Sequence, residues 1–490
     1  MIAIASVLPR ARPRRVVPLL LMVAATAFSA CGRAAEVVRP LTGRSDVDTI
    51  FAEYDRPDSP GCALGVILDG EFVYRRGYGA ANLEHGIPLD ADSVFRTGSV
   101  AKQFTGMLIL LLEEAGALGL DDGLRKWVPE MPDLGPITVR HLLHHTSGLR
   151  DYLALTELAG YREQEYYTPE QLLELLGRQR ALNFAPGEEY LYSNTGYFLL
   201  GLIAERASGK GMHELGEEMI FGPLGMTSSQ FYADPTQIVP RRASGYAPTD
   251  DGFVISMTTL PIVGDGSVFT SVNDLLAWDR NFYDNRLGNA DAGLIARWLA
   301  PGRLNSGATA GRGAAYGAGI SVGDYRGAEL VSHSGGFVGF RADMIRFPQQ
   351  RATVITLCNV ATASPSRSAR RVADVFLAGR LGPAEQAAQR ETALRVEEEF
   401  TLPVSQLRQF RGRYVSRELG VTYAVEIREG RLVASLPQRW DRPLTALGAG
   451  DFSDPETGFE LQFRRNSAGA VDGFTLDWGR VTGLWFERIG

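Results

Sequence analysis

Residues 99–112 read SVAKQFTGMLILLL, with a serine and a lysine three positions apart at the head of a long apolar run. On a helix, residues three apart lie on one face, so the side chains of Ser99 and Lys102 are expected to meet. A serine hydroxyl needs an adjacent base to become a nucleophile, and an amine partly removed from water can supply it. Only three of the 50 cationic residues are lysines, so a lysine one turn from a serine is expected to be used for its chemistry.

A second cluster lies in residues 186–197, which read PGEEYLYSNTGY. Tyr192 and Asn194 are two apart in a predicted loop, so that a phenol and an amide can face one cleft. Taken alone, a tyrosine such as Tyr192 is more often a half-buried packing residue, and Asn194 is more often a helix cap.

A third cluster lies in residues 327–340, which read GAELVSHSGGFVGF. The small residues after His333 allow a substrate backbone to approach the edge of a strand closely. Taken alone, a run such as Ser334, Gly335 and Gly336 is more often an ordinary turn.

In the order Ser-x-x-Lys, Tyr-x-Asn and His-x-Gly, the clusters resemble the three motifs of the serine β-lactamase and penicillin-binding protein superfamily, specifically its class C branch. The segments at 142–152, 264–278 and 333–340 are also similar to that family, and the resemblance covers roughly residues 45 to 380. It implies an α+β fold, in which an antiparallel sheet stands beside a helical lobe with the cleft between them. It also implies a serine hydrolase that needs no cofactor or metal.

The resemblance implies a role for each motif residue. Ser99 attacks an acyl carbon, and the positive charge of Lys102 lowers the pKa of Tyr192, which transfers the proton. Whether Lys102 or Tyr192 is the base stays open, because coupled groups titrate as a pair. The backbone N–H groups of Ser99 and Gly336 form the oxyanion hole, and Asn194 orients the substrate.

The third motif departs from the β-lactamases and DD-peptidases at its first residue. Those enzymes carry a lysine there, a permanent cation that holds the substrate carboxylate, whereas His333 is mostly neutral near pH 7. The chain therefore resembles the His-x-Gly members, which are D-amino-acid-specific or alkaline peptidases and esterases. Two alternatives stay open: a class C-type β-lactamase, and a lipid-anchored sensor that is acylated by a penicillin or peptide but turns over slowly.

Residues 1–30 have the layout of a bacterial export signal. Four arginines precede the apolar run 16–28, which is too short to span a bilayer, and Ser29, Ala30 and Cys31 follow. This order resembles a lipoprotein cleavage box and predicts that Cys31 is lipidated, although Phe28 stands where leucine is usual and cleavage near Ser29 is the alternative. The predicted location is the cell envelope, on a lipid anchor facing the periplasm or otherwise secreted, with 31–44 as a tether.

Removal of the signal takes the net charge from −7 to −11, because four arginines and no acid are lost. A mildly acidic chain argues against a nucleic-acid partner, so the expected partner is a small-molecule or peptide substrate, with the oligomeric state open. His141, His144 and His145 lack metal-ligand spacing and are expected to pack at a helix end. Cys62 and Cys358 are interpreted as small buried hydrophobes. Because the resemblance makes their strands neighbours, a disulfide is the alternative in an oxidising compartment.

The chain divides into a hydrolase domain over 45–381, a linker helix over 382–400 and a C-terminal domain over 401–490. For the hydrolase domain, the sequence predicts a hairpin at 62–79 and strands near 328–334, 338–346 and 352–360. It also predicts helices at 99–116, 138–145, 169–179, 195–208, directly after Ser271, and at 366–379. Short alternating strands with glycine turns in the last domain predict a small antiparallel barrel. It resembles the lipocalin-like domain appended to some hydrolases of this family, and we expect a packed interior and a role in limiting access to the cleft.

Overall fold

The computed structural model describes residues 45–162, 165–383, 400 and 402–489. The predicted signal and tether, and most of the predicted linker helix, lie outside these residues. Within the described ranges, no helix combines the length and the apolar character that a membrane crossing requires.

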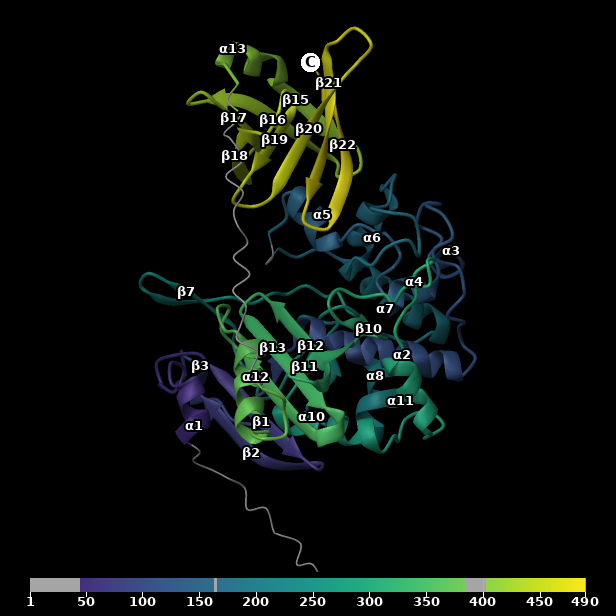
Figure 1. Ribbon diagram of the computed structural model, residues 1–490, viewed down its shortest axis with the longest axis vertical. Coiled ribbons are helices and arrows are strands. Elements are labelled where there is room, and N and C mark those ends of the chain that lie inside the picture. Colours follow the sequence, from purple (N-terminus) through teal and green to yellow (C-terminus); the bar gives the residue numbers. More distant parts are fainter. Residues whose placement is uncertain (1–44, 163–164, 384–399, 401, 490) are drawn as a thin grey trace, which may run out of the picture. The chain divides into compact units, whose positions relative to one another are not determined.

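A seven-stranded antiparallel sheet forms the centre of the hydrolase domain (Figure 1). Its strand order is β10-β11-β12-β13-β14-β1-β2, so the N-terminal hairpin pairs with the last strand of the domain. Asp69 and Gly70 turn the hairpin with φ of 50° and 79°, as a two-residue turn of the mirror-image type requires. The strands are β1 (Cys62–Leu68), β2 (Glu71–Tyr78), β10 (Ala315–Tyr316), β11 (Ser321–Tyr325), β12 (Ala328–Phe337), β13 (Phe340–Phe347) and β14 (Ala352–Cys358).

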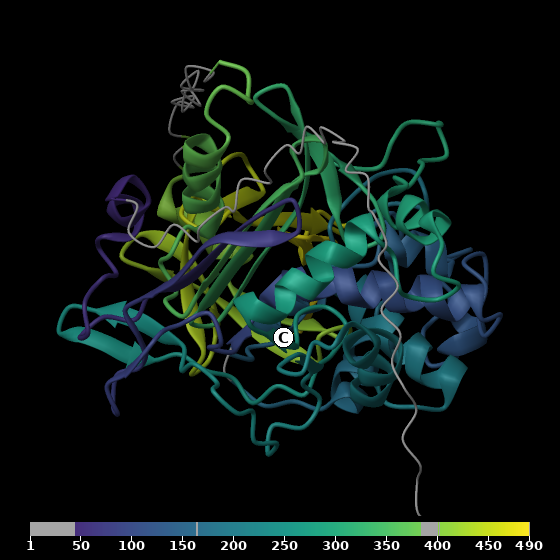
Figure 2. The same ribbon diagram turned by 90° about the horizontal axis from the view of Figure 1, so that it is seen from below.

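Helices cover both faces of this sheet (Figure 2). On one face, α1 (Ser45–Asp48) and α12 (Pro365–Phe376) share an apolar core with the strands. On the other face, α2 (Lys102–Glu114) and α10 (Val272–Tyr283) do the same. The sheet is thus buried on both sides, and the observed architecture confirms the predicted α+β fold.

The remaining helices and turns belong to the helical lobe and to the connections, except the last helix and the last turn, which pack against the barrel. The helices are α3 (Leu124–Trp127), α4 (Val139–Leu143), α5 (Tyr152–Leu158), α6 (Pro169–Gly177), α7 (Asn194–Ser208), α8 (Met212–Gly216), α9 (Gly222–Leu224), α11 (Ala292–Leu299) and α13 (Val404–Leu407). Short turns of other helical types lie at Thr49–Phe51, Gly98–Ala101, Glu217–Phe221, Pro348–Gln350 and Arg408–Phe410. Minor strands are β3 (Ala80–Asn82), β4 (Ile87–Pro88), β5 (Phe95–Arg96), β6 (Gln230–Phe231), β7 (Tyr246–Thr249), β8 (Gly252–Ile255) and β9 (Val268–Thr270).

Capping residues determine where several of these helices begin. The Thr168 side chain accepts a hydrogen bond from the backbone N–H of Gln171, and Pro169 occupies the first turn of α6. Ser271 accepts from the N–H of Asp274 at the start of α10, as the sequence predicted. Because these capping contacts involve residues only three positions apart, the sequence alone predicts where the two helices begin.

The predicted helix over 99–116 is divided in the structure. A 3₁₀ turn, Gly98–Ala101, carries Ser99, and α2 begins only at Lys102. Gly98 has φ of 53°, and a Cβ atom there would lie 2.6 Å from the backbone nitrogen of Gly336. The chain at Ser99 is therefore shaped by its close contact with β12 and not by helix propensity.

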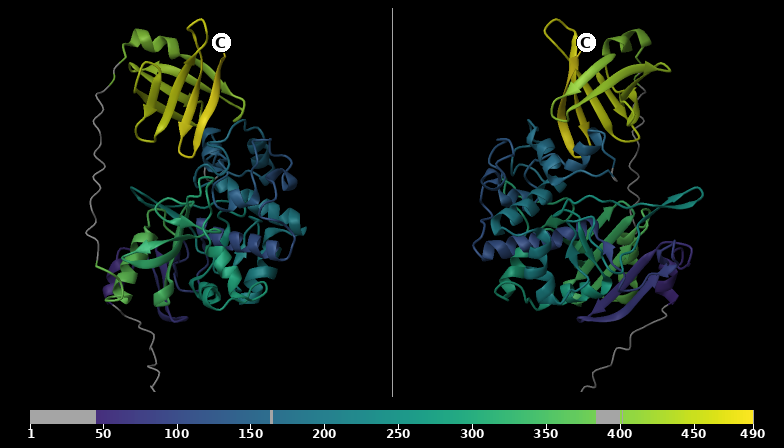
Figure 3. Two further views of the ribbon diagram at one scale, coloured as in Figure 1. Left: turned by 45° about the vertical axis from the view of Figure 1, so that its right-hand side comes forward. Right: turned by 180° about the vertical axis from the view of Figure 1, so that it is seen from behind.

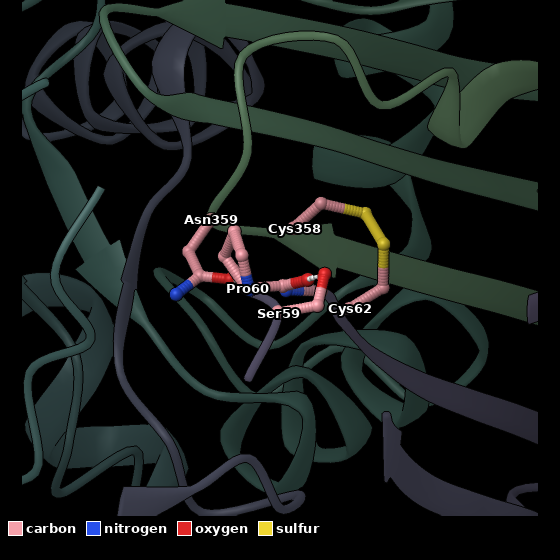
Figure 4. The surroundings of a disulfide bond; sticks show 6 residues. Ser59, Pro60, Cys62, Cys358 and Asn359 are labelled. Carbon is pink, nitrogen blue, oxygen red and sulfur yellow. Dashed lines mark hydrogen bonds between the residues drawn. A yellow bond between two sulfur atoms is a disulfide. The ribbon is translucent and has the colours of Figure 1, made fainter. Parts of the chain in front are cut away.

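Cys62 and Cys358 form a disulfide (Figure 4). Both are buried, as expected for small hydrophobes, but they are opposed in the register of β1 and β14, which brings the two sulfurs into bonding distance. Beside them, the side-chain oxygen of Asn359 accepts from the N–H of Gly61 at 2.8 Å, at the same end of these two strands. The favoured interpretation as two small hydrophobes without a bond was wrong, and the alternative, a disulfide, is what the structure contains. The resemblance already made the two strands neighbours, but the register that places Cys62 opposite Cys358 follows only from the structure.

The C-terminal part forms a closed, eight-stranded antiparallel barrel (Figure 3). Four of the eight strands were predicted from alternation. The aromatic side chains of Tyr414, Phe463, Phe474 and Phe486 pack against one another, which agrees with a packed interior. The strands are β15 (Gly412–Ser416), β16 (Val421–Arg428), β17 (Arg431–Leu436), β18 (Trp440–Ala446), β19 (Asp451–Asp454), β20 (Phe459–Arg465), β21 (Val471–Trp478) and β22 (Val481–Ile489).

Candidate active site

Lys102 is the centre of a buried hydrogen-bond network. Its Nζ donates to the Ser99 hydroxyl at 3.2 Å, to Asn194 Oδ1 at 2.8 Å and to the backbone carbonyl of Asp265 at 2.6 Å. An ammonium group has three N–H donors, so this geometry uses each of them on an oxygen. The structure thus brings Ser99 and Lys102 together, as their spacing predicted, and adds Asn194 to them, as the resemblance implied.

Burial changes the acidity of this lysine. The loss of solvent lowers the pKa of Lys102 to about 8, and the charge of Arg480 acts in the same direction, while the Asp265 and Asp151 carboxylates oppose it. About a tenth of the molecules would then carry a neutral Lys102 amine at pH 7. A neutral amine within hydrogen-bond distance of a serine hydroxyl can accept its proton.

Tyr192 lies against the same lysine. Lys102 Nζ is 5.0 Å from the centroid of the Tyr192 ring, whose hydroxyl is buried without a hydrogen-bond partner among the described residues. Burial raises the pKa of Tyr192 well above its usual value, and the neighbouring Ser99 hydroxyl and Arg480 offset that rise only in part. The hypothesis that the Lys102 charge lowers the pKa of Tyr192 was therefore wrong, because desolvation dominates at this depth.

An aspartate holds Asn194 in place. Asp151 Oδ2 accepts from the backbone N–H of Asn194 at 2.7 Å and from its Nδ2 at 3.0 Å. The side-chain oxygen of Asn194 is thereby left to face Lys102. Asp151 also caps α5 by accepting from the N–H of Leu153. The sequence analysis missed Asp151, although an aspartate directly before a helical pattern is a recognisable cap signal.

The backbone of β12 touches the turn that carries the serine. A Cβ atom on Gly335 would lie 2.7 Å from the backbone nitrogen of Ser99 and 2.1 Å from the carbonyl oxygen of Thr97. Only a residue without a side chain fits there, which explains the glycine after Ser334. Gly336 packs against Gly98 in the same way, so two backbone segments meet beside the nucleophile.

His333 is held in a buried pair with Tyr316. Its Nδ1 lies 2.7 Å from the Ser334 carbonyl, which can only accept, so Nδ1 carries the proton and Nε2 accepts from the Tyr316 hydroxyl at 2.9 Å. Burial, together with the charge of Lys102, lowers the pKa of His333 to about 4. The side chain is neutral throughout the physiological range, as the sequence predicted.

Two of the three upstream histidines, His141 and His145, have different structural roles. His141 completes a capping box with Thr138 at the start of α4, which is the helix-end role expected for all three. His145 instead lies in the wall of the site, with its ring 4.2 Å from that of Tyr192 and its Nδ1 accepting from the N–H of Ser193. In the described part of the chain, no group of three or more His, Cys, Asp or Glu residues could hold a metal ion.

A cation from the barrel also reaches the site. The Arg480 guanidinium lies 5.4 Å from the Tyr192 ring centroid, and its Nη2 lies 3.5 Å from Asp151 Oδ1. The sequence analysis missed Arg480 entirely, since nothing local connects residue 480 to residue 99.

A cavity of about 560 Å³ adjoins this region. Its lining includes Phe337, the residue after Gly336, together with Leu153 and Thr156 of α5 and Trp440 and Arg442 of β18. The barrel therefore contributes side chains to a cavity that lies next to Gly336 at the end of β12.

Residues 47–378 match the family model described as Beta-lactamase, and the chain belongs to this family. Among curated relatives, it is 30% identical over 372 residues to a D-aminopeptidase of Gluconobacter oxydans (strain 621H), with 75% of this chain and 65% of that protein covered. It is 33% identical over 309 residues to penicillin-binding protein 4* of Bacillus subtilis (strain 168), with 59% of this chain and 66% of that protein covered. The chain thus spans about two thirds of the length of these relatives.

Solved structures share the fold. A penicillin-binding protein homologue from Pyrococcus abyssi, described as octameric, superposes with a TM-score of 0.59 at 24% identity and covers 90% of this chain and 98% of that one. A D-amino acid amidase from Ochrobactrum anthropi SV3 superposes with a TM-score of 0.57 at 22% identity, covering 68% of this chain and 99% of that one. At these identities the likeness supports the fold alone.

Proposed function

We propose that this protein is a serine hydrolase that cleaves an amide or ester bond through an acyl-enzyme on Ser99. One observation carries the proposal: the Ser99 hydroxyl lies 3.2 Å from the buried Nζ of Lys102, whose pKa burial lowers to about 8. A serine beside an amine that can lose its proton near neutral pH has the arrangement that nucleophilic catalysis requires.

In the acylation step, Ser99 Oγ bonds to the carbonyl carbon while its proton passes to the neutral Lys102 amine. The negative charge on the former carbonyl oxygen is stabilised by the backbone N–H groups of Ser99 and Gly336, an oxyanion hole that mutagenesis elsewhere values at about 10²–10³ in rate per donor. When the carbonyl re-forms, the bond to the leaving group breaks. The leaving amine or alcohol takes its proton from the Lys102 ammonium, with the Tyr192 hydroxyl as the relay.

Deacylation repeats these steps with water. Lys102, neutral again, accepts a proton from the water that attacks the ester carbon, and Ser99 leaves with the proton returned. The Tyr192 hydroxyl stays protonated at rest because burial raises its pKa, so we assign it the relay and not the base. Asn194 holds the lysine through its Oδ1, and its Nδ2, which donates one N–H to Asp151, has a second N–H for the substrate.

For the substrate, we propose an amide or ester of the amino-acid type, and a D-amino acid on the acyl side in particular. Support comes from the relatives that carry the name D-aminopeptidase and from the neutral His333 at the position where β-lactamases and DD-peptidases hold a cation. The similarity to a penicillin-binding protein keeps penicillin acylation as an outcome of the test.

We also propose export, with Cys31 as a lipid-modified first residue. The support is the order of charge, apolar run and small residues in 1–31.

The test is a panel of D-alanine p-nitroanilide, its L-isomer, p-nitrophenyl acetate and nitrocefin, together with a fluorophosphonate label. We expect turnover of the D-anilide and the ester, labelling of wild type, and loss of both in Ser99→Ala but not in the exposed control Ser467→Ala. Labelling without turnover would support the slow sensor, and nitrocefin hydrolysed faster than every other substrate would support a β-lactamase. If the Ser99→Ala variant still takes up the label, Ser99 is not the nucleophile.

A further inference from the structure

The third motif supplies no charge for recognising a substrate. His333 gives one ring nitrogen to the Ser334 carbonyl and the other to the Tyr316 hydroxyl, and it is buried and neutral. If this site binds an anionic substrate group, the cation has to come from another element.

The hairpin between β21 and β22 brings such a cation. Gly479 and Arg480 form its two-residue turn, with Gly479 at φ of 58°, which a glycine in the first turn position adopts without strain. The Arg480 carbonyl accepts from Asn183 Nδ2 at 3.0 Å and from the N–H of Asp151 at 3.3 Å. The tip is thus attached to the hydrolase domain through its backbone.

A second anchor lies two residues further along. The carbonyl of Thr482 accepts from Arg150 Nε at 3.1 Å and from its Nη2 at 2.8 Å. Arg150 also forms a buried ion pair with Glu418 at 2.7 Å. Since these contacts use backbone oxygens of the hairpin and a pair outside it, the Arg480 side chain is not needed to hold the tip in position.

The Arg480 guanidinium takes no part in anchoring the hairpin tip through its backbone, and it lies near the reacting groups. It lies 5.4 Å from the Tyr192 ring, which Lys102 approaches to 5.0 Å, and the side chain keeps 34% of its exposure. Its one ion pair among the described residues is a long one, 3.5 Å from Nη2 to Asp151 Oδ1. Asp151 already accepts three N–H groups from Leu153 and Asn194, so Arg480 is not its main source of stabilisation.

We propose that Arg480 is a substrate-binding residue whose guanidinium binds a carboxylate of the compound that Ser99 attacks. This inference rests on the proposed function and specifies its substrate class as acyl compounds with a free carboxylate near the scissile bond. A planar guanidinium with five N–H donors matches a carboxylate with two parallel hydrogen bonds, which a histidine or lysine cannot do. Arg480 thereby takes over the role that the lysine of the third motif has in β-lactamases, from a different domain.

The alternative is that Arg480 only buttresses Asp151. The two roles differ in what they do to substrate choice. A buttress affects charged and uncharged substrates alike, whereas a carboxylate-binding residue changes the ratio between them.

The test uses substrate pairs that differ in one charge: mono-p-nitrophenyl adipate against its methyl ester for the acyl side, and D-alanylglycine against D-alanylglycinamide for the leaving side. The kcat/KM ratio of acid to neutral partner is measured for wild type, Arg480→Gln, Arg480→Lys and the control Arg431→Gln, an exposed arginine on β17. We expect the ratio of one pair to fall roughly 10- to 100-fold in Arg480→Gln, to recover in part in Arg480→Lys and to stay at the wild-type value in the control. The pair that responds shows on which side the carboxylate lies.

Equal loss for both members of each pair, or no change in either ratio, would overturn the proposal. Calorimetric titration of adipate into Ser99→Ala and Ser99→Ala/Arg480→Gln reports carboxylate binding without turnover, with weaker binding expected in the double variant. If wild type neither labels nor turns over any substrate, the proposed function fails. The adipate affinities of the two variants then test carboxylate binding by Arg480 independently of turnover, and equal affinities would reject that role.

Discussion

The pH dependence of kcat/KM should identify the base, and its midpoint follows from the burial of Lys102. The neutral amine is the active form, so the rate rises as pH approaches the lysine pKa of about 8 and levels off above it. Relative to the plateau, we expect about a hundredth of the rate at pH 6, about a tenth at pH 7 and half at pH 8. The charged or titratable groups that interact with the amine include the Asp265 and Asp151 carboxylates, Arg480, His145 and His333. Of these, His333 has its pKa at about 4, below the range of the assay.

The assay is p-nitrophenyl acetate hydrolysis from pH 5.5 to 9.5, read at the isosbestic wavelength of p-nitrophenol and corrected for spontaneous hydrolysis. The substrate has no titrating group, so the profile reports the free enzyme. Lys102→Arg should lose roughly 10²–10⁴ in rate and show no rising limb, because a guanidinium cannot give up its proton. Lys126→Arg is the matched control, an exposed lysine that pairs with Asp122.

Three results would refute this reasoning. A flat profile between pH 6 and 9 would mean that no group with a pKa near 8 controls the step. A limb that is still rising steeply at pH 9.5, with no plateau, would point to Tyr192, whose pKa burial raises, as the base. A Lys102→Arg variant with near-normal rate would reduce Lys102 to a fixed charge.

Three further predictions concern His333, the disulfide and the anchor. Because burial lowers the pKa of His333 to about 4, the nitrocefin-to-ester rate ratio of wild type should stay constant from pH 8.5 down to 5.5; a rise below pH 6.5 would show that the histidine gains its charge there. The disulfide joins residues 296 positions apart, so the free energy of unfolding of the Cys62→Ser/Cys358→Ser variant should be about 5 kcal/mol lower than that of wild type. The measurement is the urea midpoint, which should fall in the variant and, for wild type, only after reduction of the disulfide. The full precursor in a host with lipoprotein processing should partition with membranes and Cys31→Ser should not; equal solubility of the two would favour plain secretion.

Much of the hydrolase domain could be predicted because its signals are local. The Asp69-Gly70 turn, the Ser271 cap and the strand patterns of β12 to β14 each depend on a few neighbouring residues, and the structure contains all of them. The barrel was predicted from half its strands, since β17 and β18 carry polar and apolar residues with less regular alternation. The split of the helix at Ser99 was missed, because it arises from contact with Gly336 and not from the sequence around it.

The site shows the same division. Ser99 and Lys102 were found because their spacing places the two side chains near one another, and Asn194 was found because its motif resembles that of the family. The tertiary structure then joined the motifs through Lys102 Nζ. The acidity of these groups could not be read from the sequence. The direction of the Tyr192 shift was predicted wrongly, since the neighbouring charge was visible in the motif whereas the depth of burial was not.

By itself the sequence determined the family, the nucleophile–lysine pair and the neutral residue in the third motif, because these depend on residue identity and short spacing. The tertiary structure alone decided that Cys62 meets Cys358, that Asp151 orients Asn194, and that a barrel hairpin brings Arg480 to Tyr192. Each of those contacts joins residues dozens to hundreds of positions apart. Such pairs are brought together by the burial of whole apolar faces, a property of the folded chain as a whole that no short stretch of sequence contains.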